Sequence, residues 1–298
     1  MSTNEITADA PESISWRHYY GLTKPKVVLL ISFTALAGML LSTPGAVPWQ
    51  PLVFGLLGIS LAAAAGAVVN HIIDQRIDSL MFRTQGRPLP SGRMDTVHAA
   101  VFASLLTLGS MLTLWLLVNP LTALLTFLAF IGYAVVYTVF LKRSTPQNIV
   151  WGGLAGAAPP LLGWCSVTGE VTTESFILLL IIFVWTPPHF WPLAIKRRHE
   201  YARAHIPMLP VTHGVEFTKL QILLYTFMLF AVSLMPFIVH MSGLVYLVGA
   251  VVLGAGFIYH AFRLWRSAGD HHAMRTFGFS IFYLSLLFTV LLVDHYIT

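Results

Sequence analysis

Hydrophobic residues fill nine continuous stretches of this chain, separated by short polar segments. Each stretch is close to the ~20 apolar residues that a helix needs to cross about 30 Å of hydrocarbon. Because the stretches are continuously apolar and not alternating, they predict transmembrane helices and disfavour strands. The predicted spans are residues 27–42, 51–69, 97–118, 121–140, 149–164, 175–193, 220–240, 244–262 and 276–293. Pro159-Pro160 and Pro187-Pro188 fall within two of them and predict bends.

The composition supports the same fold class. Of the 298 residues, 56% are hydrophobic and 10% are charged, against about 25% charged in an ordinary soluble domain. This excludes a soluble enzyme, and the single cysteine, Cys165, excludes a disulfide framework. Residues 1–26 contain three acids and no apolar stretch, which predicts a short cytosolic tail and no cleaved signal. Residues 27–298 are predicted to form one all-α domain of nine transmembrane helices.

The positions of the basic residues predict the orientation of the spans. All 17 Lys and Arg residues lie before span 1 or after spans 2, 4, 6 and 8, which is one side of the membrane. By the positive-inside bias this side is the cytosol, so the N-terminus is cytosolic and the C-terminus lies on the opposite face. The pI of 9.4 then reflects topology and anionic lipid headgroups and gives no reason to expect nucleic-acid binding.

The two longest loops, 70–96 and 194–219, both lie on the cytosolic side. They are four spans apart, which hints at two related helical halves. If the halves pack together, the two loops meet over one cavity.

The first of these loops begins with Asn70, Asp74 and Asp78, whose spacing of four places them on one face of a continuing helix. A solvated helix end is the plain alternative. However, two carboxylates at i and i+4 repel each other unless a cation lies between them. Mg²⁺ fits, because it commonly takes one or two carboxylates, keeps several waters and bridges to substrate phosphates. The pattern therefore favours a metal–phosphate site.

A compact basic segment follows the acidic face and strengthens this interpretation. Arg83, Thr84 and Arg87 lie directly beyond Asp78, where they suit a metal-neutralised diphosphate. Lys142 and Arg143 are either further phosphate ligands or stop signals for span 4, and the pattern leaves both open.

The second loop is basic and aromatic. It reads Pro187-Pro188-His189-Phe190-Trp191 through Lys196-Arg197-Arg198-His199-Glu200-Tyr201. Trp191 and Tyr201 are also typical of an aromatic belt at a membrane interface. By composition alone, the role of His189 stays open.

These residues resemble the UbiA-type intramembrane prenyltransferases, and within them the branch that farnesylates haem. The resemblance runs the length of the chain. It rests on Leu22-Thr23-Lys24-Pro25-Lys26, Asn70-His71-Ile72-Ile73-Asp74-Gln75-Arg76-Ile77-Asp78, Met81-Phe82-Arg83-Thr84, Arg87-Pro88-Leu89-Pro90-Ser91-Gly92, Tyr137-Thr138, Leu141-Lys142-Arg143 with Asn148, Gly152-Gly153 to Pro159-Pro160, and Pro188-His189-Phe190-Trp191 through Pro207-Met208-Leu209-Pro210.

The resemblance implies a nine-helix bundle in a bacterial inner membrane, with two cytosolic active-site loops. It implies Mg²⁺-dependent binding of farnesyl diphosphate and farnesyl transfer to a vinyl group of haem B, giving haem O. Asn70, Asp74 and Asp78 would hold Mg²⁺. The implied substrate-binding residues are Lys24, Arg83, Thr84, Arg87, Tyr137, Lys142, Arg143, Asn148 and Lys196. The aromatic candidates to face an allylic cation are Phe82, Tyr133, Tyr137, Phe190 and Trp191.

The second loop departs from relatives that act on phenolic acids, which carry a second Asp-rich motif there. This chain has His189, Lys196 and Glu200 instead, with Glu200 where the family would have Asp. A second full metal site is therefore not expected. Lys196, Arg197 or Arg198 could pair with haem propionates, and His189 or His199 could ligate or orient the haem. His189 and Glu200 join the predicted catalytic residues.

Three alternatives remain open at this stage. A prenyltransferase acting on an aromatic or quinone precursor would need the acidic motif that the second loop lacks. A secondary transporter would need ionisable groups at mid-membrane, where this chain has almost none. A purely structural subunit would leave the repelling acidic face unexplained.

A downstream haem-modifying or oxidase-assembly protein is a further expected partner.

Overall fold

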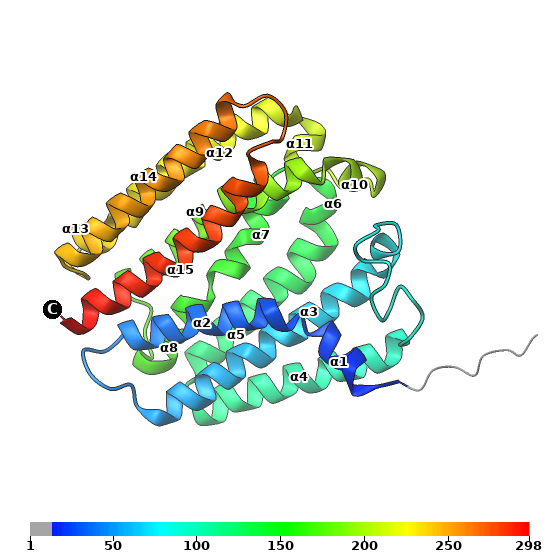
Figure 1. Ribbon diagram of the computed structural model, residues 1–298. Coiled ribbons are helices and arrows are strands. Elements are labelled where there is room, and N and C mark those ends of the chain that lie inside the picture. Colours follow the sequence, from blue (N-terminus) through cyan, green and yellow to red (C-terminus); the bar gives the residue numbers. More distant parts are fainter. Residues whose placement is uncertain (1–13, 298) are drawn as a thin grey trace, which may run out of the picture.

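The structure is a computed structural model that describes residues 14–297, and within this range the chain is helical with no strand (Figure 1). The helices are α1 (Trp16–Leu22), α2 (Pro25–Leu41), η1 (Pro51–Gly55), α3 (Leu56–Asp78), α4 (Thr96–Leu117), α5 (Pro120–Ile131), η2 (Gly132–Leu141), α6 (Lys142–Ser144), α7 (Asn148–Ala157), α8 (Pro159–Thr168), α9 (Thr173–Lys196), α10 (Arg198–Arg203), α11 (Leu209–Thr212), α12 (Gly214–Ser233), α13 (Met235–Ile238), α14 (Leu244–Arg266) and α15 (Ala273–Ile297). Of the predicted tail, residues 1–13 lie outside the described residues.

All nine predicted apolar stretches are helical. Between residues 14 and 297, seven helices are long and apolar enough to cross a membrane, or eight if α1 and α2, bent by 53°, form one span. The stretch predicted at 149–164 is divided into α7 and α8, of ten residues each, because Pro159 and Pro160 begin a new helix. In contrast, α9 continues through Pro187, Pro188 and Pro192 as one helix.

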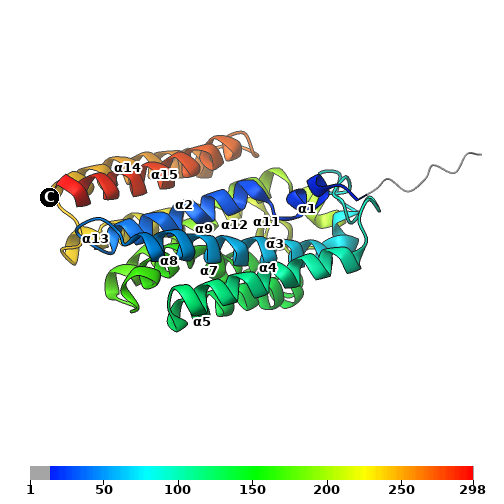
Figure 2. The same cartoon turned by 90° about the horizontal axis from the view of Figure 1, so that it is seen from below.

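The helices lie side by side in a bundle (Figures 1 and 2). Helix α2 packs against α8 and α3, while α9 packs against α7, α12 and α15. The contact between α2 and α8 is backbone to backbone. A Cβ on Gly38 would lie 2.0 Å from the Pro160 oxygen, and one on Gly163 would lie 2.0 Å from the Ala35 oxygen. Glycine is therefore required at both positions.

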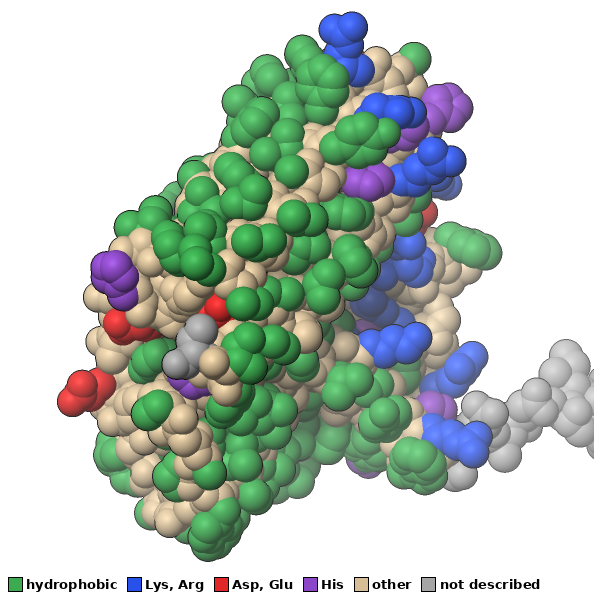
Figure 3. All heavy atoms as spheres, turned by 60° about the vertical axis from the view of Figure 1, so that its left-hand side comes forward, with side chains coloured by type: hydrophobic (Ala, Val, Ile, Leu, Met, Phe, Trp, Pro, Cys, Tyr) green, Lys and Arg blue, Asp and Glu red, His purple; other side chains and the backbone are tan. Residues whose placement is uncertain are grey.

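The two ends of the bundle differ in charge. Figure 3 shows Lys and Arg side chains gathered at one end, and most of the visible acidic side chains at the other. Helix α1 and the C-terminal end of α15 lie at opposite ends of the bundle (Figure 1). This arrangement agrees with the odd number of predicted crossings and with basic residues on one side.

A π-helical segment, η2, lies beside the end of α3. Within it the Thr138 hydroxyl donates to the Tyr133 carbonyl, five residues earlier, at 2.8 Å. Such segments are rare and frequently mark functional sites. Here η2 brings Tyr133 and Tyr137 to the same region of the bundle as Asn70.

Candidate active site

The last turns of α3 carry Asn70, Asp74 and Asp78, and all three side chains are buried. The Asn70 amide donates to Asp74 Oδ2 at 2.8 Å and to the Thr138 hydroxyl at 3.2 Å. The predicted shared face is confirmed, since the helix continues unbroken through Asp78.

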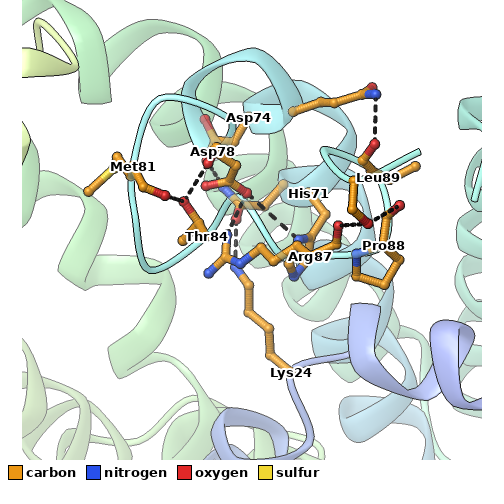
Figure 4. Close-up of polar contacts among 12 residues, drawn as sticks. Lys24, His71, Asp74, Asp78, Met81, Thr84, Arg87, Pro88 and Leu89 are labelled. Atoms are coloured by element: carbon orange, nitrogen blue, oxygen red, sulfur yellow. Dashed lines mark hydrogen bonds and ion pairs between the residues drawn. The ribbon is translucent and has the colours of Figure 1, made fainter. Parts of the chain in front are cut away.

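Each of these three side chains is paired with a different cation. Lys24 donates to Asn70 Oδ1 at 2.5 Å, and Lys142 donates to Asp74 Oδ2 at 2.5 Å. Arg87 donates to Asp78 Oδ2, also at 2.5 Å. Figure 4 shows Lys24 and Arg87 converging on the acidic face from separate segments. Repulsion between Asp74 and Asp78 was expected to be uncompensated, and this expectation is wrong. Each carboxylate has its own positive partner.

The segment after α3 is fastened back onto that helix. The Thr84 hydroxyl donates to the Asp78 carbonyl at 2.8 Å, and the Gln75 amide donates to the Leu89 carbonyl at 3.1 Å. Leu89 is buried in a small cluster with Leu22. Thr84 thus holds the loop that presents Arg87, and its hydroxyl is already used within the protein.

The two long loops meet, as predicted. Met81 from the first loop packs in one buried cluster with Trp191, Ile195 and Tyr201 from the second. Burial raises the pKa of the Tyr201 phenol, while the charges of Arg83 and Arg197 act in the opposite direction. Tyr201 is therefore a neutral group between positively charged side chains of both loops.

Two neighbouring apolar hollows, here called the lobes of one cavity because they share lining residues, lie beside the paired charges. The first, the α3 lobe, measures about 170 Å³, and Lys24 lies at its polar end. Its small-residue wall on α3 consists of Ala62, Ala63, Gly66 and Ala67. The second, the aromatic lobe, measures about 310 Å³ and is lined by Tyr137, Trp185 and Phe190 among others. Residues common to both lobes are Val27, Ile31, Tyr133, Gly152 and Gly156.

Three of the five predicted cation-facing aromatic residues line this cavity. The Tyr133 and Tyr137 rings stack at 5.9 Å between centroids, and Phe190 lines the aromatic lobe. The prediction is wrong for the other two. Phe82 is 86% exposed on the first loop, and Trp191 is buried edge-on against Tyr225 at 5.2 Å.

His189 lies behind the aromatic lobe. Its ring is stacked between those of Trp185 and Phe277, with ring centroids 4.1 Å and 4.7 Å away, respectively. Its Nδ1 is hydrogen-bonded to the Ser280 hydroxyl at 2.7 Å, and the Trp185 indole donates to the Ser280 carbonyl at 2.8 Å. Because Trp185 lines the lobe, His189 supports the cavity wall from the side of α15.

The other second-loop candidates lie nearer the surface. The Lys196 ammonium is 3.6 Å from Asp270 Oδ2, and Arg198 reaches the same oxygen at 3.6 Å. Glu200 Oε2 is buried without a hydrogen-bond partner. The structure thus separates an acid-rich cluster on the first loop from a basic second loop.

The remaining predicted residues flank the acidic cluster. Arg143 lies 3.9 Å from Asp74 and donates to the Ile73 carbonyl at 3.3 Å. Asn148 is fully buried and donates to the Lys142 carbonyl at 3.3 Å, so it holds the turn that carries Lys142.

Sequence reasoning missed Thr138, Asp270 and Ser280 as partners of the site. Thr138 stands beside Tyr137 in a quoted motif, so a signal for it existed. Asp270 and Ser280 come from distant segments, and no local pattern indicated them.

The oxygen donors fit Mg²⁺. Between residues 14 and 297 no three His, Cys, Asp or Glu side chains form a complete metal-binding group. Mg²⁺ does not need one, because it is commonly held by one or two carboxylates, waters and substrate phosphates. Asp74 Oδ1 is buried without a hydrogen-bond partner, which leaves it available as a ligand.

Comparisons with known proteins identify relatives of this chain. The UbiA prenyltransferase family matches residues 31–287. A relative named protoheme IX farnesyltransferase, from Thioalkalivibrio sulfidiphilus, is 66% identical over 100% of this chain and 98% of its own length. A second relative of the same name, from Nitrosococcus oceani, is 59% identical over 95% of each chain.

Solved structures share the fold at low identity. A digeranylgeranylglyceryl phosphate synthase structure gives a TM-score of 0.81 at 19% identity, covering 95% of this chain and 99% of its own. A UbiA homologue from Archaeoglobus fulgidus bound to DMAPP and Mg²⁺ gives a TM-score of 0.62 at 17% identity, with 92% and 99% covered.

Proposed function

Because this chain belongs to the UbiA prenyltransferase family, we propose that it transfers the farnesyl group of farnesyl diphosphate to a vinyl group of haem B, giving haem O and diphosphate. Full-length relatives that carry the name protoheme IX farnesyltransferase support this acceptor. The same chain is proposed to lie in a bacterial inner membrane with its basic end in the cytosol.

One observation carries the proposal: Lys24, the first of three cations that contact the acidic face of α3, lies at the polar end of an apolar cavity. Lys24 bonds Asn70 and also lines the α3 lobe. A diphosphate bound among Lys24, Lys142 and Arg87 therefore has an apolar space directly beside it for its prenyl chain. A purely structural subunit would need neither feature.

The charges support departure of the diphosphate. Asn70, Asp74 and Asp78 would hold Mg²⁺, and the bound ion would supply Lewis-acid neutralisation of phosphate charge. Lys24, Lys142 and Arg87 stabilise the negative charge that develops as the bond between the allylic carbon and oxygen breaks. Asn148 and Thr84 keep Lys142 and Arg87 in place through the backbone.

The cavity then protects the allylic cation that forms. Tyr133 and Tyr137 present stacked rings at the junction of the two lobes, where π faces stabilise positive charge. The apolar walls exclude water, which would otherwise capture the cation. The vinyl π electrons of haem form the new carbon–carbon bond, and water adds to the resulting porphyrin-side cation with loss of a proton.

The second loop is proposed to receive the acceptor. Lys196 and Arg198 carry positive charge that suits propionates, and Asp270 holds both in position. His189 is held by its hydrogen bond to Ser280 and supports the wall of the aromatic lobe. Glu200 has a carboxylate oxygen without a hydrogen-bond partner, so it is available to accept a hydrogen bond from the acceptor. Contact with a downstream haem-modifying protein is proposed as well.

The test is incubation of the purified protein in lipid with haem B, farnesyl diphosphate and Mg²⁺, followed by mass analysis of the haem. We expect haem to gain one farnesyl group and one hydroxyl. If haem stays unmodified while a phenolic acid is prenylated under the same conditions, the acceptor assignment is wrong.

A further inference from the structure

The α3 lobe extends along α3 to Ile59, its lining residue farthest from Asn70 in that helix. Its α3 wall runs from Ala67 and Gly66 down to Ile59, and Leu162 of α8 lines it as well. We propose that Ile59 limits the prenyl chain to three isoprene units. This inference rests on the proposed function, in which the α3 lobe holds the prenyl chain of the diphosphate.

The length of the wall fits a fifteen-carbon donor. Ile59 precedes Asn70 by eleven residues of continuous helix, which span about 16 Å at about 1.5 Å per residue. A farnesyl group has twelve carbons in line, and at about 1.2 Å per bond, as in an extended backbone, it reaches roughly 13 Å. The radius of its terminal methyl adds about 2 Å. A fourth isoprene unit adds about 5 Å and would meet Ile59.

The side chains along the wall change size at that depth. Ala62, Ala63, Gly66 and Ala67 carry at most a methyl group, so the helix backbone itself forms the surface of the lobe. Ile59 is the first bulky residue on this wall, and it is 2% exposed. The α3 lobe therefore becomes narrower at Ile59.

The space beyond Ile59 is filled. Ile59 belongs to the same packed cluster as Met39, Leu114 and Leu162. A Cβ on the adjacent Gly58 would lie 2.5 Å from the Leu114 side chain. Because close-packed interiors yield little, this end acts as a rigid stop.

The first test removes the bulk of the Ile59 side chain. Purified Ile59→Ala protein in lipid is given farnesyl and geranylgeranyl diphosphates in competition with Mg²⁺, and equilibrium binding of each is measured. We expect the preference for the twenty-carbon chain over the fifteen-carbon chain to rise at least about tenfold, as for a pocket that gains a few carbons of space. The added Leu162→Ala change should raise it further.

The second test places a bulky side chain on the same wall, nearer to Lys24 and Asn70. Ala63→Leu places a bulky side chain four residues nearer to Asn70 and should reject farnesyl while keeping geranyl diphosphate. This variant does not remove core packing, so it tests the inference if Ile59→Ala folds poorly. Leu57→Ala is the matched control, because Leu57 is 46% exposed on the outer face of the same helix. Its chain-length preference should equal that of the wild type.

The outcomes separate the two proposals. Unchanged preference in both Ile59→Ala and Ala63→Leu, with diphosphate binding intact, would overturn the role of Ile59. Binding that shifts as expected while haem stays unmodified supports Ile59 and contradicts only the acceptor. A wild-type protein that binds no prenyl diphosphate would overturn both.

Discussion

Lys142 and Asp74 form an ion pair of 2.5 Å although 68 positions separate them in the chain. Lys142 follows the π-helical segment η2, and Asp74 lies in the last turns of α3. With Lys24 on Asn70 and Arg87 on Asp78, each proposed metal ligand contacts a cation of the protein itself. We expect these cations to turn from the proposed ligands to phosphate oxygens when the donor binds.

Lys142→Met should therefore have opposite effects on metal and donor. Freed from its partner, Asp74 should bind Mn²⁺ alone more tightly than in the wild type, as measured by electron paramagnetic resonance. Farnesyl diphosphate affinity should fall at least about tenfold, because a buried charge-assisted contact is lost. Arg143→Met is the control, since Arg143 is half-exposed and 3.9 Å from Asp74. Weaker Mn²⁺ binding in Lys142→Met would contradict the exchange.

Asp74→Asn and Asp78→Asn should each reduce turnover at least about 100-fold. Even the loss of a group that only supports a metal ligand typically lowers metal affinity or activity by about 10–100-fold. From the spacing of the two carboxylates alone, folding is expected to stay intact or improve slightly through relief of repulsion. The observed pairs reverse that expectation: Asp74→Asn leaves Lys142 without its partner, so thermal stability without metal should fall. Turnover against Mg²⁺ concentration and a melting curve test both parts. Near-normal activity of Asp74→Asn at low Mg²⁺ would remove the metal assignment.

His189→Ala and Glu200→Ala should impair haem farnesylation while weakening diphosphate binding much less than Asp74→Asn. The reason is their position on the second loop and the end of α9, away from the paired charges of α3. Parallel measurements of haem product and diphosphate affinity decide the point. Ser280→Ala should resemble a mild form of His189→Ala, because it removes the 2.7 Å hydrogen bond that fixes the ring. Equal loss of diphosphate affinity in His189→Ala and Asp74→Asn would contradict this division between the loops.

A reporter joined to the C-terminus should be active only on the side of the membrane opposite the basic loops. The described ends of the chain lie at opposite ends of the bundle, and the Lys and Arg side chains gather at the end near α1 (Figures 1 and 3). Activity of a cytosol-only reporter at that position would show that the orientation is inverted.

The sequence predicts the parts of this site that follow from helical spacing. Asn70, Asp74 and Asp78 share a face because a helix repeats every 3.6 residues, and the structure continues that helix to Asp78. The meeting of the two loops also follows, since both are on the basic side of a bundle. Local pattern could therefore locate the acidic cluster and its neighbouring basic loop.

The pattern could not determine which way individual loop side chains point. Phe82 and Trp191 both belong to quoted motifs, yet one faces outward and the other enters a separate packed cluster. The pairing of Asp270 with Lys196 and Arg198 depends on how α14 and α15 dock beside α9, which is a tertiary property. Likewise, Lys142 is either a stop signal or a ligand until η2 places it on Asp74.

The backbone contact between α2 and α8 has a consequence for biogenesis. Gly38 meets Pro160 and Gly163 meets Ala35, so two helices join that leave the ribosome more than a hundred residues apart. Helix α2 is made early, and its final neighbour does not exist until α8 has been synthesised and inserted. The α3 lobe, which both helices line, is therefore completed late, and until then the face of α2 that receives α8 lacks its final neighbour.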